Sequence, residues 1–337
     1  MIGPVPMHVV TDNRRIPEAL VGGIVVIGNF DGVHRGHQQV IGQARRRATT
    51  DGLPLTVMTF EPHSREFFAP EAPPIRLTPF SVKRRLLEGL GIDLLLALPF
   101  DRAFSKMSAD AFVEEILVDR LAANHAVVGY DFAFGHKRSG NVDKLRESAA
   151  KHGFTVTVVD PVANGGLVYS SSRIRDCLWQ GAPDQAAHLL GHWWEVEGVV
   201  VTGDKRGRQL GFPTANFDVT GYIEPAFGVY AVRLGWVEDG QTVWHDGVAN
   251  LGRRPTFGKT NAVLEVHLLD FSGDLYGRTC RVAFTEFLRS ERKFDGLDSL
   301  KAQIAEDTAK ARECLADPKN AIDSLDPETV DSSRSAC

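Results

Sequence analysis

The sequence has few cysteines, no long apolar run and no excess of positive charge. Its four cysteines are widely spaced and form no CxxC pair, so they predict free thiols in a reducing cytoplasm. No apolar segment is long enough to span a bilayer, and the N-terminus lacks the charged-then-apolar pattern of a secretion signal. The net charge of −5 excludes a general attraction to nucleic acid or anionic membranes. Any anion-binding site must therefore be local.

The composition indicates a globular protein of two domains. The chain has 337 residues, of which 43% are hydrophobic and 24% charged, and this length and balance are typical of two ordinary domains. We expect a first domain over residues 1–185, a second over 186–317 and a polar tail over 318–337.

Strand-like and helix-like segments alternate in the first half of the chain. The expected strands cover 24–28, 55–60, 93–98, 125–129 and 154–159, and the expected helices cover 38–48, 81–90, 109–121 and 142–152. This alternation predicts an α/β fold with a doubly wound parallel sheet, whose ligands bind beyond the carboxyl ends of the strands. No GxGxxG follows the first strand, which disfavours a nicotinamide-dependent dehydrogenase.

The most informative segment joins the first strand to the first helix and reads GNFDGVHRGH over residues 28–37. It places His34 and His37 at a helix N-terminus, where free N–H groups and the helix dipole favour phosphate. Gly32 and Gly36 allow a sharp turn and a close approach to a ligand. We interpret the segment as a nucleotide site whose histidines stabilise charge on a transferring phosphoryl group. A zinc site is the alternative, but no Cys, Glu or third His lies nearby to complete it.

Three further polar segments follow predicted strands. They are TFEPH over 59–63, GYDFAFG over 129–135 and, after a Gly-Gly turn, SSSRIR over 170–175. Taken alone, the third segment is better explained as a plain helix cap with solvated arginines. Beside the histidine segment, its serine hydroxyls, helix N–H groups and arginines favour a polyphosphate site.

Short strands separated by turns dominate the second half. Segments 194–201, 228–234, 242–249, 262–269 and 279–287 predict an antiparallel β-barrel, and a helix is expected over 296–315. The loop 203–211 contains three glycines and three basic residues, which suit it to wrapping a polyphosphate. Thr214 and Asn216 follow it and offer the hard oxygen ligands that Mg²⁺ prefers. Glu265 shares a strand face with His267 and can act as a general base, unless this is simply an exposed face.

These segments resemble the motifs of known enzymes. The decapeptide 28–37 is similar to the signature of the nucleotidyltransferases that make FAD, within the HxGH superfamily. The run 203–216 resembles the riboflavin kinase signature, and 247–257 resembles an internal motif of that kinase family. Over residues 22–315 the chain thus resembles the bacterial bifunctional riboflavin kinase/FMN adenylyltransferase family, also called FAD synthetase.

The resemblance implies two reactions in sequence. ATP phosphorylates riboflavin to FMN, and a second ATP adenylylates FMN to FAD with release of pyrophosphate. The implied catalytic residues are His34, His37 and Arg175 in the first domain and Glu265, the base for the 5′-hydroxyl of riboflavin, in the second. Mg²⁺ is the implied cofactor, held by Thr214 and Asn216.

The resemblance also implies the residues that bind substrates. Those implied for ATP and its phosphates are Gly28, Phe30, Asp31, Gly36, Ser170, Ser171, Ser172, Gly203, Lys205, Gly207, Arg208, Gly211 and Pro213. Those implied for the flavin are His63, Asp131, Arg289 and Phe294. We expect small-molecule substrates, no nucleic acid and no membrane partner, and the sequence leaves the existence of a homo-oligomer open.

Two departures from the family pattern keep alternative functions open. Ser64 stands where the family commonly has proline, and His192 stands where arginine is frequent. One alternative is an enzyme with a single activity and one silent domain. The other is a non-catalytic flavin-binding regulator. Separate assays of the two half-reactions distinguish these alternatives.

Overall fold

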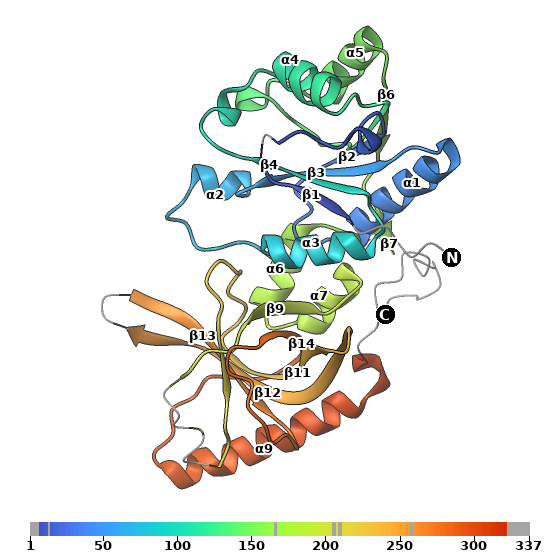
Figure 1. The fold of residues 1–337 in the computed structure, drawn as a ribbon. Coiled ribbons are helices and arrows are strands. Elements are labelled where there is room, and N and C mark those ends of the chain that lie inside the picture. Colours follow the sequence, from blue (N-terminus) through green and yellow to red (C-terminus); the bar gives the residue numbers. More distant parts are fainter. Residues whose placement is uncertain are drawn as a thin grey trace. The chain divides into compact units, whose positions relative to one another are not determined.

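The computed structural model describes residues 7–321, apart from 13, 165–166, 204–206, 208–210 and 257–258. The chain forms two compact units (Figure 1). Among the described residues, the first unit contains those up to Ala72 and Phe80–Ser170, and the second contains Pro73–Pro79 and those from Ser171 to Ala321. No helix in the described ranges is long and apolar enough to cross a membrane.

The first unit is built on a six-stranded sheet in which every pair of neighbours is parallel, as predicted. In spatial order the strands are β1 (His8–Val10), β4 (Leu94–Pro99), β3 (Leu55–Glu61), β2 (Ile24–Ile27), β5 (His125–Gly129) and β6 (Thr155–Val159). From β2 the chain first moves outward through β3 and β4, and then crosses to β5 and β6 on the other side. The strand order therefore reverses at β2 and β5, and sheets of this class bind ligands at such a point.

Helices connect these strands. They are η1 (Glu18–Leu20), α1 (Arg35–Asp51), α2 (Ser64–Phe68), α3 (Phe80–Gly89), η2 (Phe104–Lys106), α4 (Ala109–Ala111), η3 (Phe112–Arg120), η4 (His136–Arg138) and α5 (Val142–His152). Apolar side chains of β2, β4 and β5 form one core with those of η3 and α5. The predicted helix over 109–121 is present, but η3 winds as a π-helix, which an apolar pattern does not distinguish from an α-helix. A short ribbon, β7 (Ala163–Asn164) with β8 (Leu167–Val168), follows β6.

The second unit contains the predicted antiparallel barrel. Its strands, in spatial order, are β10 (Ala215–Asp218), β13 (Lys259–Leu268), β12 (Gln241–Thr256), β11 (Gly228–Glu238), β14 (Thr279–Ser290) and β9 (Trp194–Val199). The chain just after β9 bridges back to β10, where the N–H of Val201 donates to the carbonyl oxygen of Asn216 at 2.9 Å, so the two edges of the sheet meet. Helix α9 (Leu297–Ala316) packs on β11, β12 and β14, and η5 (Pro318–Asn320) follows it (Figure 1).

The division between the units differs from the predicted boundary at residue 185. Helices α6 (Ser171–Trp179) and α7 (Pro183–Leu190) group with the barrel, because α7 packs on α6, β9 and β14. The segment Pro73–Pro79 also belongs to this unit. Its carbonyl oxygens accept hydrogen bonds from Nε of Arg175 (2.7 Å), the indole N–H of Trp194 (2.9 Å) and the backbone N–H of Ile223 (2.8 Å).

Candidate active sites

The two histidines of the 28–37 segment form a stacked pair at the start of α1. Their ring centroids lie 3.6 Å apart with an interplanar angle of 18°, and Phe30 packs edge-on against His37 at 5.2 Å. His34 is the N-cap of α1, and its Nδ1 accepts the backbone N–H of His37 at 3.4 Å. Since Nδ1 is the acceptor, the neutral ring carries its proton on Nε2. The site therefore offers an imidazole N–H donor beside the positive end of a helix.

His37 is held in its uncharged form. Burial lowers the pKa of His37 well below its ordinary value, and the nearby His34 and Lys83 lower it further. Its Nδ1 is buried and has no hydrogen-bond partner among the described residues. An unpaired buried nitrogen is costly, so a ligand that bonds to it would be stabilised.

The backbone of this loop is strained around the histidines. Phe30 and Val33 have φ values of 49° and 42°, which residues other than glycine rarely adopt, and Gly32 has a φ of 88°. A Cβ at Gly36 would lie 3.1 Å from the His34 ring and 3.4 Å from Cβ of Tyr169. The absence of a side chain at Gly36 therefore makes room for the His34 ring.

Gly36→Ala should slow the reaction that the sequence predicts for the histidine pair, without weakening the fold. The new methyl group must push the His34 ring by a few tenths of an ångström, and we expect about a tenfold loss of rate, because small misplacements of catalytic groups are costly. Alanine is also the better helix former. The measurement is the initial rate of the histidine-dependent reaction together with the melting temperature. A normal rate would show that the ring position is not critical.

The ends of β3 and β5 place two further predicted residues at the same edge of the sheet. His63 follows β3, is 7% exposed and caps α2 by accepting the N–H of Arg65 at Nδ1 (3.1 Å). Asp131 follows β5 and is exposed in a turn closed by the N–H of Phe132 and the carbonyl oxygen of Gly129 (3.1 Å). Gly28 and the buried Asp31 lie in the loop after β2. Because the parallel strands β2, β3 and β5 end at a common edge, all four residues lie at the edge of the sheet where such folds bind ligands.

The serine segment lies at the boundary between the units. Ser170 ends the last stretch of the first unit, whereas Ser171 and Ser172 begin α6 in the second, so the predicted helix start is confirmed. Arg175 is 5% exposed, and its Nε is used to hold the carbonyl oxygen of Ile75. The structure thus groups Arg175 with the barrel unit, and its predicted role opposite the histidines stays a prediction.

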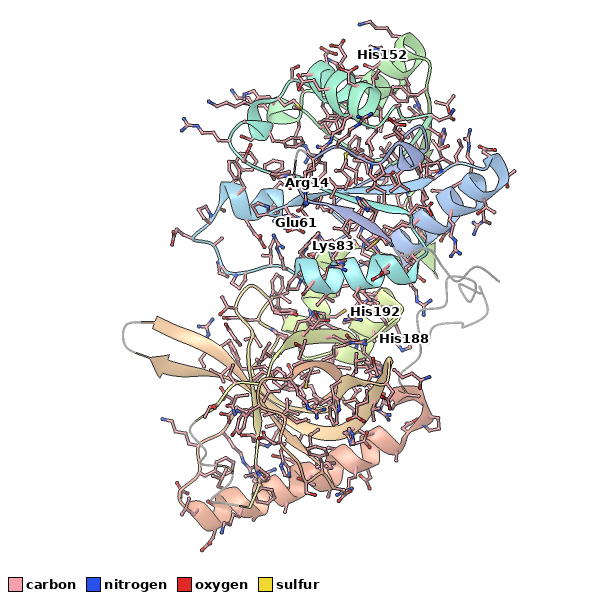
Figure 2. All side chains as sticks on the ribbon, viewed as in Figure 1. Arg14, Glu61, Lys83, His152, His188 and His192 are labelled. Carbon is pink, nitrogen blue, oxygen red and sulfur yellow. The ribbon has the colours of Figure 1, made fainter. Side chains whose placement is uncertain are left out.

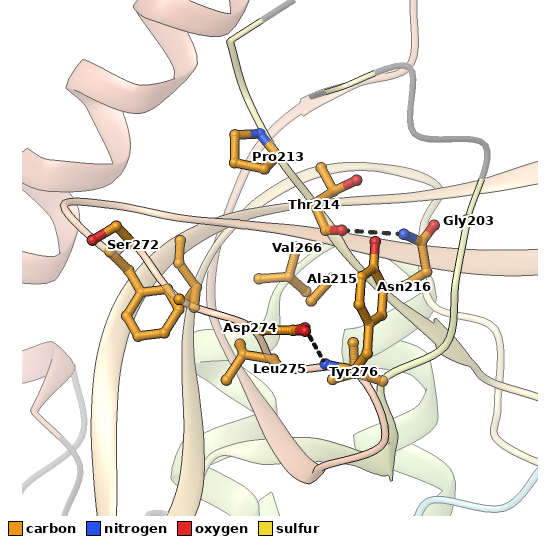
Figure 3. Close-up of a pocket in the computed structure, with 14 residues that line it drawn as sticks. Gly203, Pro213, Thr214, Ala215, Asn216, Val266, Ser272, Asp274, Leu275 and Tyr276 are labelled. Atoms are coloured by element: carbon orange, nitrogen blue, oxygen red, sulfur yellow. Dashed lines mark hydrogen bonds between the residues drawn. The ribbon is translucent and has the colours of Figure 1, made fainter. Parts of the chain in front are cut away.

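The second candidate site is a cavity of about 310 Å³ in the barrel unit. Figure 3 shows residues that line it, and these include the predicted Gly203, Pro213, Thr214 and Asn216. Its lining also includes the continuous stretch Phe271, Ser272, Gly273, Asp274, Leu275 and Tyr276. Four predicted residues from two separate stretches of the motif are therefore brought to one cavity.

The segment around Thr214 is fixed by two hydrogen bonds and by the close approach of Gly203. The amide Nδ2 of Asn216 donates to the carbonyl oxygen of Thr214 at 3.3 Å (Figure 3). Nδ1 of His267 donates to the carbonyl oxygen of Pro213 at 2.9 Å. A Cβ at Gly203 would lie 2.4 Å from Oδ1 of Asn216, so only glycine fits there. With its nitrogen engaged, Asn216 keeps its carbonyl oxygen as a potential cation ligand beside the Thr214 hydroxyl.

Glu265 lies in the middle of β13 between two asparagines. The strand register pairs it with Asn216 of β10 and with Asn250 of β12. Directly paired residues project from the same face of a sheet, so the three polar side chains form a row across three strands. The cavity is lined by Val266 and Leu268, which alternate with Glu265 and project from the opposite face. Asn216 thus belongs both to the lining of the cavity and to the row that contains Glu265.

Arg289, near the end of β14, and Phe294, which follows that strand, are the two predicted flavin contacts of the second unit, and they lie close together. Arg289 binds Asp307 of α9 through two nitrogens, with Nη2 at 2.7 Å and Nε at 2.9 Å, and its guanidinium lies 5.8 Å from the centre of the Phe294 ring. Gln303 also donates to Asp307, at 2.7 Å. These contacts fix the direction of Arg289, whose predicted flavin contact stays a prediction.

Part of the predicted phosphate loop lies outside the described residues. This applies to Lys205 and Arg208. Gly207 is described, and its carbonyl oxygen accepts the N–H of Phe212 at 2.8 Å. Gly211 has a φ of 90°, a conformation that favours glycine.

Sequence reasoning missed three polar residues of these sites. Asn250 lies in the 247–257 motif. Aligning the polar positions of the two neighbouring strands could have paired it with Glu265. Lys83 and Glu61 form a buried ion pair of 2.8 Å at the carboxyl end of β3. The only indication of it was a lysine on the apolar face of the predicted helix 81–90, next to Val82 and four residues before Leu87.

The comparisons with known proteins cover both sites. Family models of FAD synthetase and riboflavin kinase match residues 16–173 and 190–315. A bifunctional riboflavin kinase/FMN adenylyltransferase of Pseudomonas fluorescens is 45% identical over 88% of this chain and 94% of its own length. The protein of the same name from Escherichia coli K12 is 42% identical over 87% and 92%. A solved structure from Streptococcus pneumoniae, described as a macrolide-efflux protein, is 30% identical with a TM-score of 0.79, over 91% of this chain and 99% of its own.

Proposed function

Because this chain belongs to the bifunctional riboflavin kinase/FMN adenylyltransferase family and catalyses both reactions, we propose that each reaction takes place in one of its two units. The first unit is assigned adenylyl transfer and the second riboflavin phosphorylation. The observation that carries the assignment is the separation of the two sets of polar residues: the stacked histidines belong to the parallel sheet, and Glu265 belongs to the barrel.

In the first unit, a phosphate oxygen of FMN attacks the α-phosphorus of ATP. The new P–O bond forms as the bond to the β-phosphate breaks, and pyrophosphate leaves with the bonding electrons. The Nε2–H of His34 and the N–H groups at the start of α1 stabilise the negative charge that develops on the phosphate oxygens. Neutral imidazoles act here as hydrogen-bond donors, and most of the rate comes from positioning and electrostatics.

The remaining predicted residues of the first reaction are assigned by their position or their residue type. His63 and Asp131, at the ends of β3 and β5, are proposed to contact FMN, while Gly28, Phe30, Asp31 and Gly36 shape the site for ATP. For Ser170, Ser171, Ser172 and Arg175, the last three of which group with the second unit, contact with the triphosphate is proposed from their residue types and not from their position. Serine hydroxyls and a guanidinium are well suited to phosphate oxygens.

In the second unit, Glu265 is proposed to take the proton of the riboflavin 5′-hydroxyl. The freed oxygen attacks the γ-phosphorus of ATP, the bond to the β-phosphate breaks, and FMN and ADP leave. Thr214 and Asn216 are proposed to hold Mg²⁺ with the phosphates, because both line the cavity and Asn216 is the direct strand partner of Glu265. When bound, Mg²⁺ neutralises phosphate charge. Gly203, Lys205, Gly207, Arg208, Gly211 and Pro213 are proposed to surround the ATP phosphates, and Arg289 and Phe294 to contact the flavin.

A cytoplasmic location and the absence of nucleic-acid partners complete the proposal. Cys177, Cys280 and Cys314 are free thiols, as a reducing compartment allows. The net charge of −5 gives no general attraction to nucleic acid.

The test is a time course of the purified protein with riboflavin, ATP and Mg²⁺, with the flavins separated by chromatography. We expect FMN to appear first and FAD later. FMN alone would indicate a silent first unit, and conversion of added FMN but not of riboflavin would indicate a silent second unit. Tight flavin binding without any turnover would overturn the proposal in favour of a regulator. Omission of Mg²⁺ should stop both reactions.

A further inference from the structure

A buried ion pair lies at the carboxyl edge of the sheet in the first unit. Lys83 of α3 has only 2% of its side chain exposed, and its Nζ lies 2.8 Å from Oε1 of Glu61, the last residue of β3, which is 19% exposed. Figure 2 labels both residues on these two elements. The rest of the buried face of α3 is apolar, and includes Val82, Leu86 and Leu87.

Stability alone does not explain this pair. Removing an ammonium and a carboxylate from water costs about as much free energy as their attraction returns, and apolar residues of similar volume often do as well. A methionine in place of Lys83 would match the apolar residues around it. The pair therefore points to a use for its charge.

The pair lies close to the histidine loop. The end of β3 is hydrogen-bonded to that loop at two points. The N–H of Gly28 donates to the carbonyl oxygen of Met58 (3.1 Å), and the hydroxyl of Thr59 donates to the carbonyl oxygen of Asn29 (3.2 Å). Glu61 follows Thr59 by two residues, so the two side chains project from the same face of the strand. Glu61 thus brings Lys83 toward the loop that contains His34 and His37.

The charge of Lys83 acts on His37. The groups whose charges lower the pKa of His37 are His34, stacked on its ring, and Lys83, from α3. The two stacked imidazoles cannot both be protonated without strong repulsion, so the pair itself brings hydrogen bonds but little positive charge. Within the described part of the chain, Nζ of Lys83 makes one hydrogen bond, to Glu61, and an ammonium has three donors.

We propose that Lys83, held in place by Glu61, is a positioning residue of the adenylyl-transfer site, whose fixed positive charge at the edge of the histidine loop attracts the phosphates of ATP and FMN. This inference rests on the assignment of adenylyl transfer to the first unit. It adds a cation from α3 to a site otherwise built from the loops after β2, β3 and β5.

The test compares Lys83→Met and Lys83→Arg in the full chain. For Lys83→Met we expect a loss of about 10- to 100-fold in kcat/KM for FMN adenylylation, with riboflavin phosphorylation unchanged. Without the neighbouring positive charge the pKa of His37 rises toward its ordinary value, so the acid limb of the adenylylation pH profile moves to higher pH. Lys83→Arg keeps the charge and should keep the wild-type profile. Lys144→Met, which removes the exposed pair with Asp110, is the matched control and should change neither activity.

The double variant Glu61→Gln/Lys83→Met separates function from folding. It leaves no unpaired buried charge, so a purely structural pair would let it recover both stability and adenylylation. Our inference predicts recovery of the melting temperature without recovery of adenylylation. Wild-type adenylylation in Lys83→Met, or its recovery in the double variant, would overturn the inference. Failure of the wild-type protein to convert FMN to FAD would instead overturn the proposed function.

Discussion

Replacing His34 by alanine should slow FMN adenylylation by about 10²- to 10³-fold, while riboflavin phosphorylation continues at the wild-type rate. The substitution removes the Nε2–H donor that the cap geometry directs away from the helix backbone, and it also removes the N-cap of α1. Loss of the cap alone costs about 0.5–2 kcal/mol of stability, which could be mistaken for the loss of a catalytic group.

A second substitution at the same position separates these effects. Asparagine is a good N-cap but has no imidazole, so His34→Asn should keep the stability of the fold and still lose adenylylation. His152→Ala, at the end of α5, is the matched control for the loss of a histidine from this unit. The measurements are FMN-to-FAD and riboflavin-to-FMN rates with the melting temperature. Loss of both activities in a folded His34→Asn variant would contradict the two-site assignment.

Glu265→Gln should nearly abolish FMN formation and leave FMN-to-FAD conversion intact. The amide keeps the size of the side chain and its place between Asn216 and Asn250, but it cannot accept the hydroxyl proton, and general-base catalysis contributes about 10²- to 10⁴-fold. The two rates are measured separately, with riboflavin and with FMN as substrate.

The control for Glu265 is Glu306→Gln, which removes an exposed carboxylate paired with Lys310 on α9. It should leave both rates unchanged. If Glu265→Gln phosphorylated riboflavin at a rate near wild type, another group would have to accept the proton, and the row of polar side chains on β10, β13 and β12 would have only a binding role.

Elements with a strong local pattern were predictable from the sequence. The buried strand before GNFDGVHRGH and the alternation of strands and helices were sufficient for the parallel sheet, and the short strands of the second half were sufficient for the barrel. The three-residue strand β1 was missed, because so short an edge strand has too few residues for a periodic pattern. The motifs also located the site residues along the chain.

What the sequence could not give was long-range contact. Lys83 is separated from Glu61 by a helix and a loop, and no local pattern links the two. Asn250 reaches Glu265 only through the register of β12 and β13. The grouping of Arg175 with the barrel unit depends on Ile75, 100 residues earlier in the chain. Periodicity describes neighbours in sequence, and these pairings are set by packing.

The seven residues Pro73–Pro79 make the kinase half of the chain discontinuous. A gene fragment that began at residue 186 would encode every strand of the barrel, yet it would leave the buried indole N–H of Trp194 without its acceptor, at a cost of about 1–3 kcal/mol. One cut in the chain therefore cannot yield the whole of the second unit, because its residues come from two separate stretches.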